Sequence, residues 1–294
     1  ILGDASGGVD APAAIIVETI QAEGGLNVAT TKWLQDLAKV AKKHGALFII
    51  DDIQVGCGRT GTFFSFEEAG ITPDIICLSK SIGGMGLPMS LLLLAPELDV
   101  LKPGQHNGTF RGNNLAFVAA KAALDLWQDA EYEKEIKAKS SIVRSYLKSL
   151  IKDFPKAGAH LRGRGMLLGI SFDDAKIASK ISEAAFKRGL VIETSGAEDQ
   201  VLKLLPPLTI TERELVKGLA ILKAAMLDVL DPHTTKTTAK KTVRIAKPAN
   251  DDMVTKTTTI TTTKKTTNSD EVIRMAIPTY QAAQQSQELT EHLF

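Results

Sequence analysis

Two short apolar runs, each ending in a side chain that can do chemistry, constrain this chain more than any other feature. The run at 46–50 leads directly into Asp51, and the run at 74–78 leads through one serine to Lys80. Continuous apolar runs of this length are typical of buried parallel strands. The carboxyl ends of neighbouring strands in an open α/β sheet face one ligand-binding crevice. We therefore expect Asp51 and Lys80 to converge on a small molecule.

An amine and a carboxylate in one crevice have a specific chemical use. A lysine amine can form a Schiff base with an aldehyde cofactor, and a carboxylate beside a pyridine nitrogen keeps that nitrogen protonated, so that the ring accepts electrons. Pyridoxal phosphate is a cofactor of this kind. The simpler interpretations are a solvated strand-end lysine for Lys80 and a turn or helix-cap acid for Asp51.

Composition favours a small-molecule partner. The 294 residues are 44% hydrophobic, and 35 basic against 34 acidic side chains give a net charge of +1, so the chain can bury a core and has no electrostatic bias toward nucleic acid. The apolar stretches are too short to span a membrane, and the two cysteines lack metal-site spacing. We expect a soluble, cytoplasmic protein that binds no metal, nucleic acid or membrane.

Several spaced motifs occur in a fixed order. They are the run Asp51 to Gly61, the run Glu68 to Ile75, Lys80, and Gly83-Gly84-x-Gly86-Leu87-Pro88. Together they resemble the signature of the class III (ornithine/4-aminobutyrate-type) pyridoxal-phosphate aminotransferases. The runs at 51–54, 56–61, 106–114 and 193–196 resemble most the branch that transfers the ω-amino group of L-2,4-diaminobutyrate to 2-oxoglutarate in ectoine synthesis. The resemblance covers roughly residues 1 to 230.

The resemblance implies the fold class and its division. The expected fold is α/β, fold type I of the pyridoxal-phosphate-dependent transferases, with a mostly parallel sheet flanked by helices. We expect residues 1–128 to form the cofactor-binding large domain, 129–231 a smaller α+β domain, and the Thr/Lys-rich segment 232–294 a disordered tail or, less favoured, edge strands. We also expect an N-terminal portion to be missing, with its phosphate-binding loop and ring-stacking aromatic residue.

The resemblance also implies roles for the cofactor-binding residues. Lys80 would carry pyridoxal phosphate and move the proton during transfer, and Asp51 would hold the ring nitrogen charged. Gln54 would be a hydrogen-bond donor close to the phenolic oxygen of the ring. Thr109 would donate to the cofactor phosphate of a partner subunit, which implies a homodimer or higher homo-oligomer with shared active sites.

On the substrate side, the resemblance assigns Glu18 and Glu23 as lining carboxylates. Many members of the family have an arginine for the α-carboxylate of 2-oxoglutarate where this chain has Lys203. Lysine lacks the bidentate fork of arginine, so Lys203 either takes over substrate binding or forms a structural ion pair with Glu23. Arg162 and Arg164 are the other candidates for a carboxylate, with a surface role as the alternative.

Three alternatives remain. The donor could be ornithine or 4-aminobutyrate, or the chain could be an incomplete, inactive fragment. A distant alternative is an NAD-dependent oxidoreductase, because Gly56-x-Gly58-x-x-Gly61 satisfies the dinucleotide fingerprint. That fingerprint requires glycines directly after a strand and at the start of a helix, whereas the residues 52–55 intervene here.

Hydrophobic periodicity and capping signals predict the other elements. Strands are expected at 13–17, 89–94 (buried), 165–172, 190–193 and 201–205, and helices from Thr30 or Thr31 to His44, at 114–127, 130–154 and 175–188, and after a capping box at Thr211 to Glu214.

Overall fold

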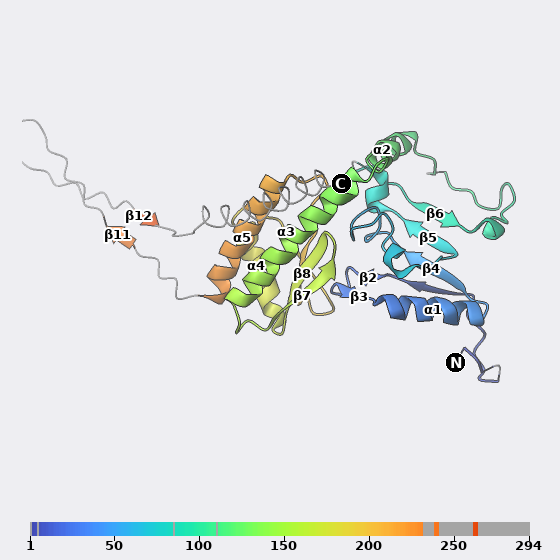
Figure 1. Ribbon diagram of the computed structural model, residues 1–294, viewed down its shortest axis with the longest axis horizontal. Helices are drawn as coiled ribbons and strands as arrows, with labels where there is room; N and C mark the ends of the chain where they lie inside the picture. Colours follow the sequence, from blue (N-terminus) through green and yellow to red (C-terminus); the bar gives the residue numbers. More distant parts are fainter. Residues whose placement is uncertain are drawn as a thin grey trace, which may run out of the picture.

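The computed structural model describes residues 2–4, 6–84, 86–109, 111–231, 238–240 and 261–263. Two four-stranded sheets with flanking helices make up most of the described structure (Figure 1). The predicted disorder of 232–294 falls mainly on residues outside it. Within that segment, only the short strands β11 (Thr238–Lys240) and β12 (Thr261–Thr263) are described, and they pair antiparallel.

The first sheet carries the two strand ends singled out above. Its order is β1 (Ala14–Val17), β4 (Leu47–Asp51), β5 (Ile75–Leu78) and β6 (Leu91–Leu94). The strands β1, β4 and β5 run parallel, and β6 runs antiparallel to β5. The helix α1 (Thr31–Lys43) packs on β4, and Ala41, Phe48 and Ile50 share a buried cluster. The fold is therefore the mostly parallel α/β arrangement that we expected.

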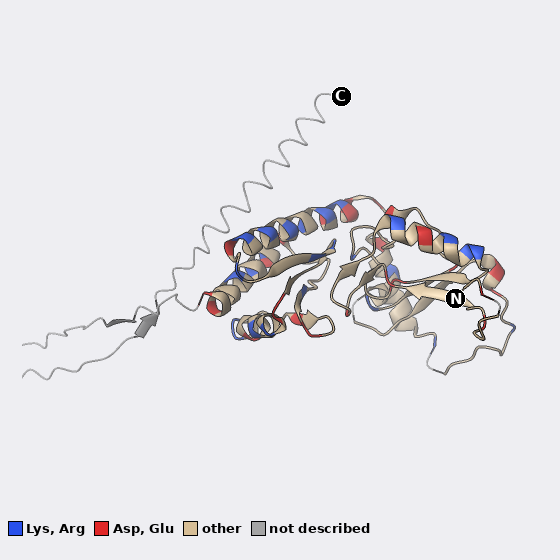
Figure 2. Ribbon diagram, turned by 90° about the horizontal axis from the view of Figure 1, so that it is seen from below, with Lys and Arg blue, Asp and Glu red and all other residues tan. Residues whose placement is uncertain are grey.

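Local signals set the bounds of α1 as predicted. The hydroxyl oxygen of Thr30 accepts a hydrogen bond from the backbone N–H of Trp33 at 3.2 Å, so Thr30 is the N-cap. Gly45, with φ +67, follows the last turn in the left-handed conformation that ends many helices. Figure 2 shows basic and acidic residues spread along α1, where Lys32 and Asp36 form an i,i+4 ion pair.

The predicted burial of the last strand of this sheet was wrong. The side chains of Leu92, Leu93 and Leu94 on β6 are 57%, 37% and 39% exposed. The physical reason is position, since β6 forms the edge of the sheet and packs mainly against β5 among the described elements. Apolar composition alone does not distinguish an edge strand from a central one.

The second sheet is antiparallel and has the order β7 (Ala159–Arg164), β8 (Leu167–Phe172), β10 (Val201–Leu204) and β9 (Glu193–Ser195). The helices α3 (Glu131–Asp153) and α4 (Ala175–Phe186) pack on it, and α5 (Glu212–Leu230) packs against both of these helices. The predicted capping box is confirmed, because Thr211 and Glu214 exchange both bonds at the start of α5.

One predicted strand of this sheet begins later than expected. The residues 190–192 are not part of β9, which begins at Glu193. Instead, the backbone N–H of Leu190 bonds to the carbonyl of Ala185 at the end of α4 at 3.0 Å, and Leu190 and Ile192 pack against the helical core. Their apolar character reflects that packing rather than strand pairing.

A junction of backbone and guanidinium contacts joins the two sheets. The buried Arg59 donates to the carbonyls of Met166 and Pro206 at 3.3 and 2.6 Å, and its own carbonyl accepts from the N–H of Met166 at 2.8 Å. Burial lowers the pKa of Arg59 to about 10. The hairpin of β2 (Ile20–Gln21) and β3 (Asn27–Val28) also lies at this junction and contacts β7. The first sheet is thereby fixed against the second.

The helix α2 (Asn114–Asp125) begins at its cap Asn113 and packs on the short 3₁₀ helix η2 (Lys80–Gly83). Two further 3₁₀ helices are η1 (Glu67–Ala69) and η3 (Pro96–Leu98). Among the helices that the structure describes, none has the length and apolar character needed to cross a membrane.

Candidate active site

Asp51 and Lys80 lie at the carboxyl ends of adjacent parallel strands, as predicted. Asp51 is the last residue of β4 and stands opposite Cys77 of β5 in the register of the sheet. Lys80 follows Cys77 by three residues and opens η2. Both residues therefore lie at the carboxyl ends of the strands, which is where α/β proteins bind ligands.

The backbone at Lys80 is strained. Its φ is +50, in the left-handed region that non-glycine residues seldom adopt, and Ser79 before it is fully extended. The hydroxyl of Ser79 donates to the carbonyl of Met89 at 2.8 Å, which holds the end of β5 against the next strand. A strained residue of this kind persists where surrounding structure enforces it, and such residues concentrate at functional sites.

The amine of Lys80 is available to a ligand. The side chain is exposed and lines a cavity of about 610 Å³ together with Arg111, Asn113 and Phe117. Within the described part of the chain, no carboxylate lies within ion-pair distance of its Nζ. An amine that no protein group engages can bond to an aldehyde.

Asp51 has one partner within its own turn. Its Oδ1 accepts the backbone N–H of Ile53 at 3.0 Å, which is the turn-acid role considered from the sequence. No basic side chain among the described residues forms an ion pair with Asp51. The carboxylate can therefore serve a protonated ring nitrogen as well as the turn.

The next residue, Asp52, is buried and has a different role. Its carboxylate accepts hydrogen bonds from the hydroxyl and the backbone N–H of Ser65, and Thr19 donates to the Ser65 hydroxyl at 2.6 Å. Burial raises the pKa of Asp52 to about 6 in spite of these bonds. Asp52 thus anchors the loop after β4 rather than facing the crevice.

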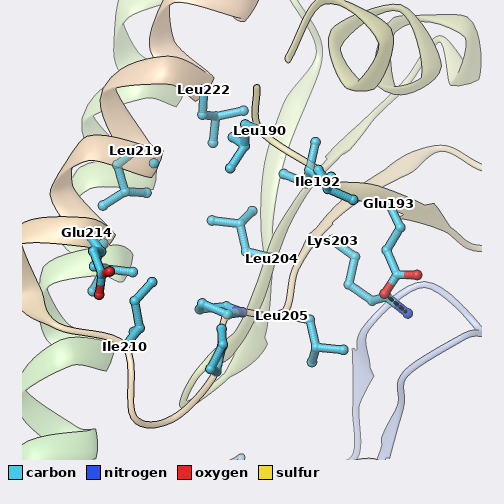
Figure 3. A pocket seen from close by; sticks show the side chains of 15 residues that line it. Leu190, Ile192, Glu193, Lys203, Leu204, Leu205, Ile210, Glu214, Leu219 and Leu222 are labelled. Atoms are coloured by element: carbon cyan, nitrogen blue, oxygen red, sulfur yellow. Dashed lines mark ion pairs between the residues drawn. The ribbon is translucent and has the colours of Figure 1, made fainter. Parts of the chain in front are cut away.

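A second group of charged residues surrounds Lys203 on β10. Its side chain is 0% exposed, and its Nζ lies 2.7 Å from Glu23 Oε1 and 3.2 Å from Glu193 Oε1. Gln54 donates from Nε2 to Glu23 Oε1 at 2.9 Å, and its Oε1 lies 3.4 Å from Lys203 Nζ. Figure 3 shows Lys203 and Glu193 turned toward each other at one side of the apolar pocket that both residues help to line.

Electrostatics connects this group with Lys80. The hydrogen bond from Lys203 lowers the pKa of Glu23 most, Gln54 lowers it further, and the charge of Lys80 adds to the same effect. Glu23 therefore lies within electrostatic reach of both lysines. The structure brings together Glu23, Gln54 and Lys203 by direct contact, and the charge of Lys80 acts on Glu23 as a weaker influence from outside this group.

Other predicted site residues lie apart or are engaged elsewhere. Glu18 is exposed, and its carboxylate accepts the N–H of Ala22 at 3.1 Å. Thr109 is exposed and does not line the cavity beside Lys80. The substrate role of Glu18 and the partner-subunit role of Thr109 stay predictions.

The two candidate arginines of β7 make structural contacts. Arg162 bonds to Asn27 and donates to the hydroxyl of Ser171 at 3.1 Å, while Arg164 pairs with Glu68 at 3.0 Å and donates to a backbone carbonyl. Both arginines join β7 to the first sheet or its loops. Neither is placed to hold a substrate carboxylate in this conformation.

The dinucleotide interpretation was wrong. The residues 52–66, all described, form turns and contain no helix. A Cβ on Gly58 would lie 2.2 Å from the Trp127 ring, so this glycine makes room for an aromatic side chain rather than for a phosphate. The helix N-terminus that the fingerprint requires is absent from this segment.

Sequence reasoning missed the roles of Arg59 and Glu193. Arg59 gave no signal beyond its place in a glycine-rich motif, because its partners lie more than a hundred positions away. Glu193 ends an apolar run, as Asp51 does, and that pattern could have marked it.

The donor set fits a pyridoxal-type group. Lys80 supplies an amine free of ion pairs in the described structure, Asp51 a carboxylate without a cationic partner, and Gln54 an amide three residues after Asp51. Bonding to an aldehyde, holding a ring-nitrogen proton and donating to a ring oxygen are the tasks that these groups can perform.

Comparison with known proteins gives consistent results. The pattern of the family described as Aminotransferase class-III matches residues 8–226. A diaminobutyrate–2-oxoglutarate transaminase of Bordetella parapertussis is 56% identical over 232 residues, which are 78% of this chain and 53% of the relative. One of Halalkalibacterium halodurans is 55% identical over 225 residues, 76% of this chain and 53% of the relative. The chain thus spans about half the length of the curated relatives it matches.

Solved structures agree in fold. The acetylornithine aminotransferase of Elizabethkingia anophelis is 34% identical with a TM-score of 0.66, over 74% of this chain and 57% of that one. The ornithine aminotransferase of Toxoplasma gondii is 28% identical with a TM-score of 0.68, over 76% of this chain and 52% of that one. The Toxoplasma structure is described as having partial occupancy of pyridoxal phosphate at its active site.

Proposed function

This chain belongs to the class III aminotransferases, whose cofactor is pyridoxal phosphate, and from that membership we propose a specific reaction. The reaction is transfer of the ω-amino group of L-2,4-diaminobutyrate to 2-oxoglutarate, giving aspartate 4-semialdehyde and glutamate. The observation that carries the proposal is the pair of strand ends, with Asp51 on β4 and Lys80 beyond β5.

Each residue of the cofactor site has one task in this proposal. Bound pyridoxal phosphate supplies an aldehyde that takes up amines and a ring that accepts electrons. Lys80 would hold that aldehyde through Nζ, and the freed Nζ would take the proton from the carbon that bears the donor amine. Asp51 would keep the ring nitrogen protonated. Gln54 would orient the ring through its phenolic oxygen.

The substrate side is formed by Lys203 with Glu18 and Glu23. Lys203 replaces the arginine of many family members and binds a substrate carboxylate as a point charge. Without substrate, the Lys203 ammonium pairs with Glu23 at 2.7 Å, because a fully buried ammonium is costly without a counter-charge. A substrate carboxylate takes over this pairing when it binds.

The proposal extends to the setting of the enzyme. We place the reaction in ectoine synthesis in the cytoplasm, in a homodimer whose Thr109 reaches the cofactor phosphate of the partner subunit. The segments 1–128, 129–231 and 232–294 are then the large domain, the small domain and a tail. The similarity to transaminases that carry the diaminobutyrate name supports the choice of donor and acceptor.

A second candidate is an ornithine-type ω-aminotransferase, because the solved structures similar to this chain include ornithine and acetylornithine enzymes. A panel of diaminobutyrate, ornithine and 4-aminobutyrate, with 2-oxoglutarate as acceptor, separates the two. Faster turnover of ornithine than of diaminobutyrate would favour the second candidate.

An absorbance spectrum tests the cofactor site itself. We expect the chain mixed with pyridoxal phosphate to gain a long-wavelength band that borohydride removes, and Lys80→Ala to abolish that band. Lys102→Ala is the matched control, since it deletes another exposed lysine and should leave the band unchanged. A band that persists in Lys80→Ala would refute the assignment of Lys80.

A further inference from the structure

The charges around Lys203 do not balance. One buried ammonium faces two carboxylates, Glu23 at 2.7 Å and Glu193 at 3.2 Å, so the group carries a net charge of one minus two, or −1. Glu23 alone would neutralise Lys203. The second carboxylate therefore needs a reason of its own.

Glu193 is held where it can meet a ligand. It stands opposite Lys203 in the register of β9 and β10, yet 54% of its side chain is exposed, whereas Lys203 is 0% exposed. The backbone N–H of Gly196 donates to the carbonyl of Glu23 at 2.9 Å, so the end of β9 is fixed to the loop that carries the other carboxylate. One side of Glu193 faces Lys203 and the other faces solvent.

A second polar group on the same strand lacks a partner. Ser195 is 3% exposed, and its Oγ makes no hydrogen bond in the described structure. Side chains two residues apart in a strand lie on one face, so Ser195 and Glu193 share a face of β9. A buried hydroxyl without a partner costs free energy, and a ligand that donates a hydrogen bond would satisfy it.

We propose that Glu193 is a specificity-determining residue that binds the second ammonium of a diamino acid donor, with Ser195 Oγ as a further acceptor. This inference rests on the proposed function. When the ω-amine of the donor is at Lys80, the far end of the molecule carries one ammonium and one carboxylate. Lys203 then pairs with the carboxylate and Glu193 with the ammonium.

The net charge of the group explains the preference. A donor end with only a carboxylate would bring a third negative charge to one ammonium, whereas a zwitterionic end adds no net charge. Glu193 can turn into water when the dicarboxylate acceptor binds, because half of its side chain is already exposed. The same site can therefore serve both substrates of the reaction.

The rival explanation is that Glu193 only neutralises Lys203. The two explanations differ in what removal of the charge does to ligand choice. A purely structural counter-ion would affect all ligands that use Lys203 alike. An ammonium-binding carboxylate affects only ligands that have the second ammonium.

The test is a binding titration of the full chain by calorimetry. The probes are L-2,4-diaminobutyrate and 4-aminobutyrate, which share a carbon skeleton and differ only in the α-amino group. We expect the wild type to prefer diaminobutyrate, and Glu193→Gln to reduce that preference about three- to fivefold, the effect of one partly exposed ion pair. Glu198→Gln removes an exposed carboxylate between β9 and β10 and should leave the preference unchanged.

Two results would overturn the inference. One is an equal loss of affinity for both ligands in Glu193→Gln, and the other is a wild type without preference for the diamino acid. If Glu193→Gln fails to fold, Glu193→Asp is the second variant, because it keeps the charge but withdraws it by one methylene. We expect Glu193→Asp to reduce the preference for diaminobutyrate over 4-aminobutyrate less than Glu193→Gln would. An unchanged preference counts against the role of Glu193. Failure of the proposed function has a different signature, the lack of a Lys80-dependent, borohydride-sensitive band.

Discussion

Replacing Gly165 with alanine should strain the junction between the two sheets at its tightest point. Gly165 has a φ of +64, and a Cβ there would lie 2.4 Å from the carbonyl carbon and 2.5 Å from the Cα of Thr60. The carbonyl oxygen of Arg59 would be 2.7 Å away. All three are backbone atoms, which cannot rotate aside as the tip of a side chain can. The loop or the second sheet must therefore move.

The expected loss in the free energy of unfolding of Gly165→Ala has two parts. Alanine in the left-handed conformation costs about 1 kcal/mol, and overpacking of a rigid contact adds about 2 kcal/mol. Gly70→Ala is the matched control, because Gly70 has a φ of +60 but nothing within 4 Å of its Cβ position, so only the first part applies. We expect free energies of unfolding lower by about 3 kcal/mol for Gly165→Ala and about 1 kcal/mol for Gly70→Ala.

Urea unfolding followed by circular dichroism measures both values. The difference between the two variants isolates the clash from the backbone preference, since their φ angles are nearly equal. If Gly165→Ala loses no more free energy of unfolding than Gly70→Ala, the backbones of the two sheets do not approach as closely as described.

Two further predictions concern stability. Thr211→Ala removes the capping box of α5 and should lower the free energy of unfolding by about 1 kcal/mol, with Thr211→Ser restoring most of it in the same urea assay. Burial raises the pKa of Asp52 to about 6 from 3.8, so the folded state holds this proton more tightly than the unfolded state. The resulting stability is present below pH 3.8 and is lost as pH rises through about 6. Relative to Asp52→Asn, the free energy of unfolding of the wild type should thus fall by on the order of 2 kcal/mol between pH 4 and pH 7. A difference between the two proteins that does not change with pH would contradict the burial of an ionisable Asp52.

The sequence predicted those parts of the fold that depend on local signals. The strand ends at Asp51 and Lys80 were predictable because an apolar run followed by a polar residue marks both the strand and its end. The first helix was predictable because Thr30 can satisfy an N–H that the helix leaves unbonded. The capping box at Thr211 follows the same logic. In each case, cause and effect lie within a few residues.

The rest depends on contacts between distant residues. Lys203 and Glu23 are 180 positions apart, and their ion pair was one of the two outcomes that the resemblance left open for Lys203. The full burial of the ammonium and its pairing with a second carboxylate, Glu193, could not be predicted from either segment. The burial of β6 was mispredicted, and Leu190 was wrongly given to a strand, because apolar composition records that a side chain packs but not against what. Arg59 was missed for the same reason, since a long-range contact leaves no periodic pattern.

The two halves of the candidate site lie on different sheets. Lys80 follows a strand of the first sheet, and Lys203 is part of a strand of the second. In the proposed function one end of the donor reacts at Lys80 while the other is held at Lys203, so the length of donor that fits is set by how the sheets meet. The contacts that fix their meeting include the Arg59 hydrogen bonds and the Cβ-free approach at Gly165. If the proposed function holds, donor length is set by this junction, whereas discrimination between donors of equal length depends on the charges beside Lys203.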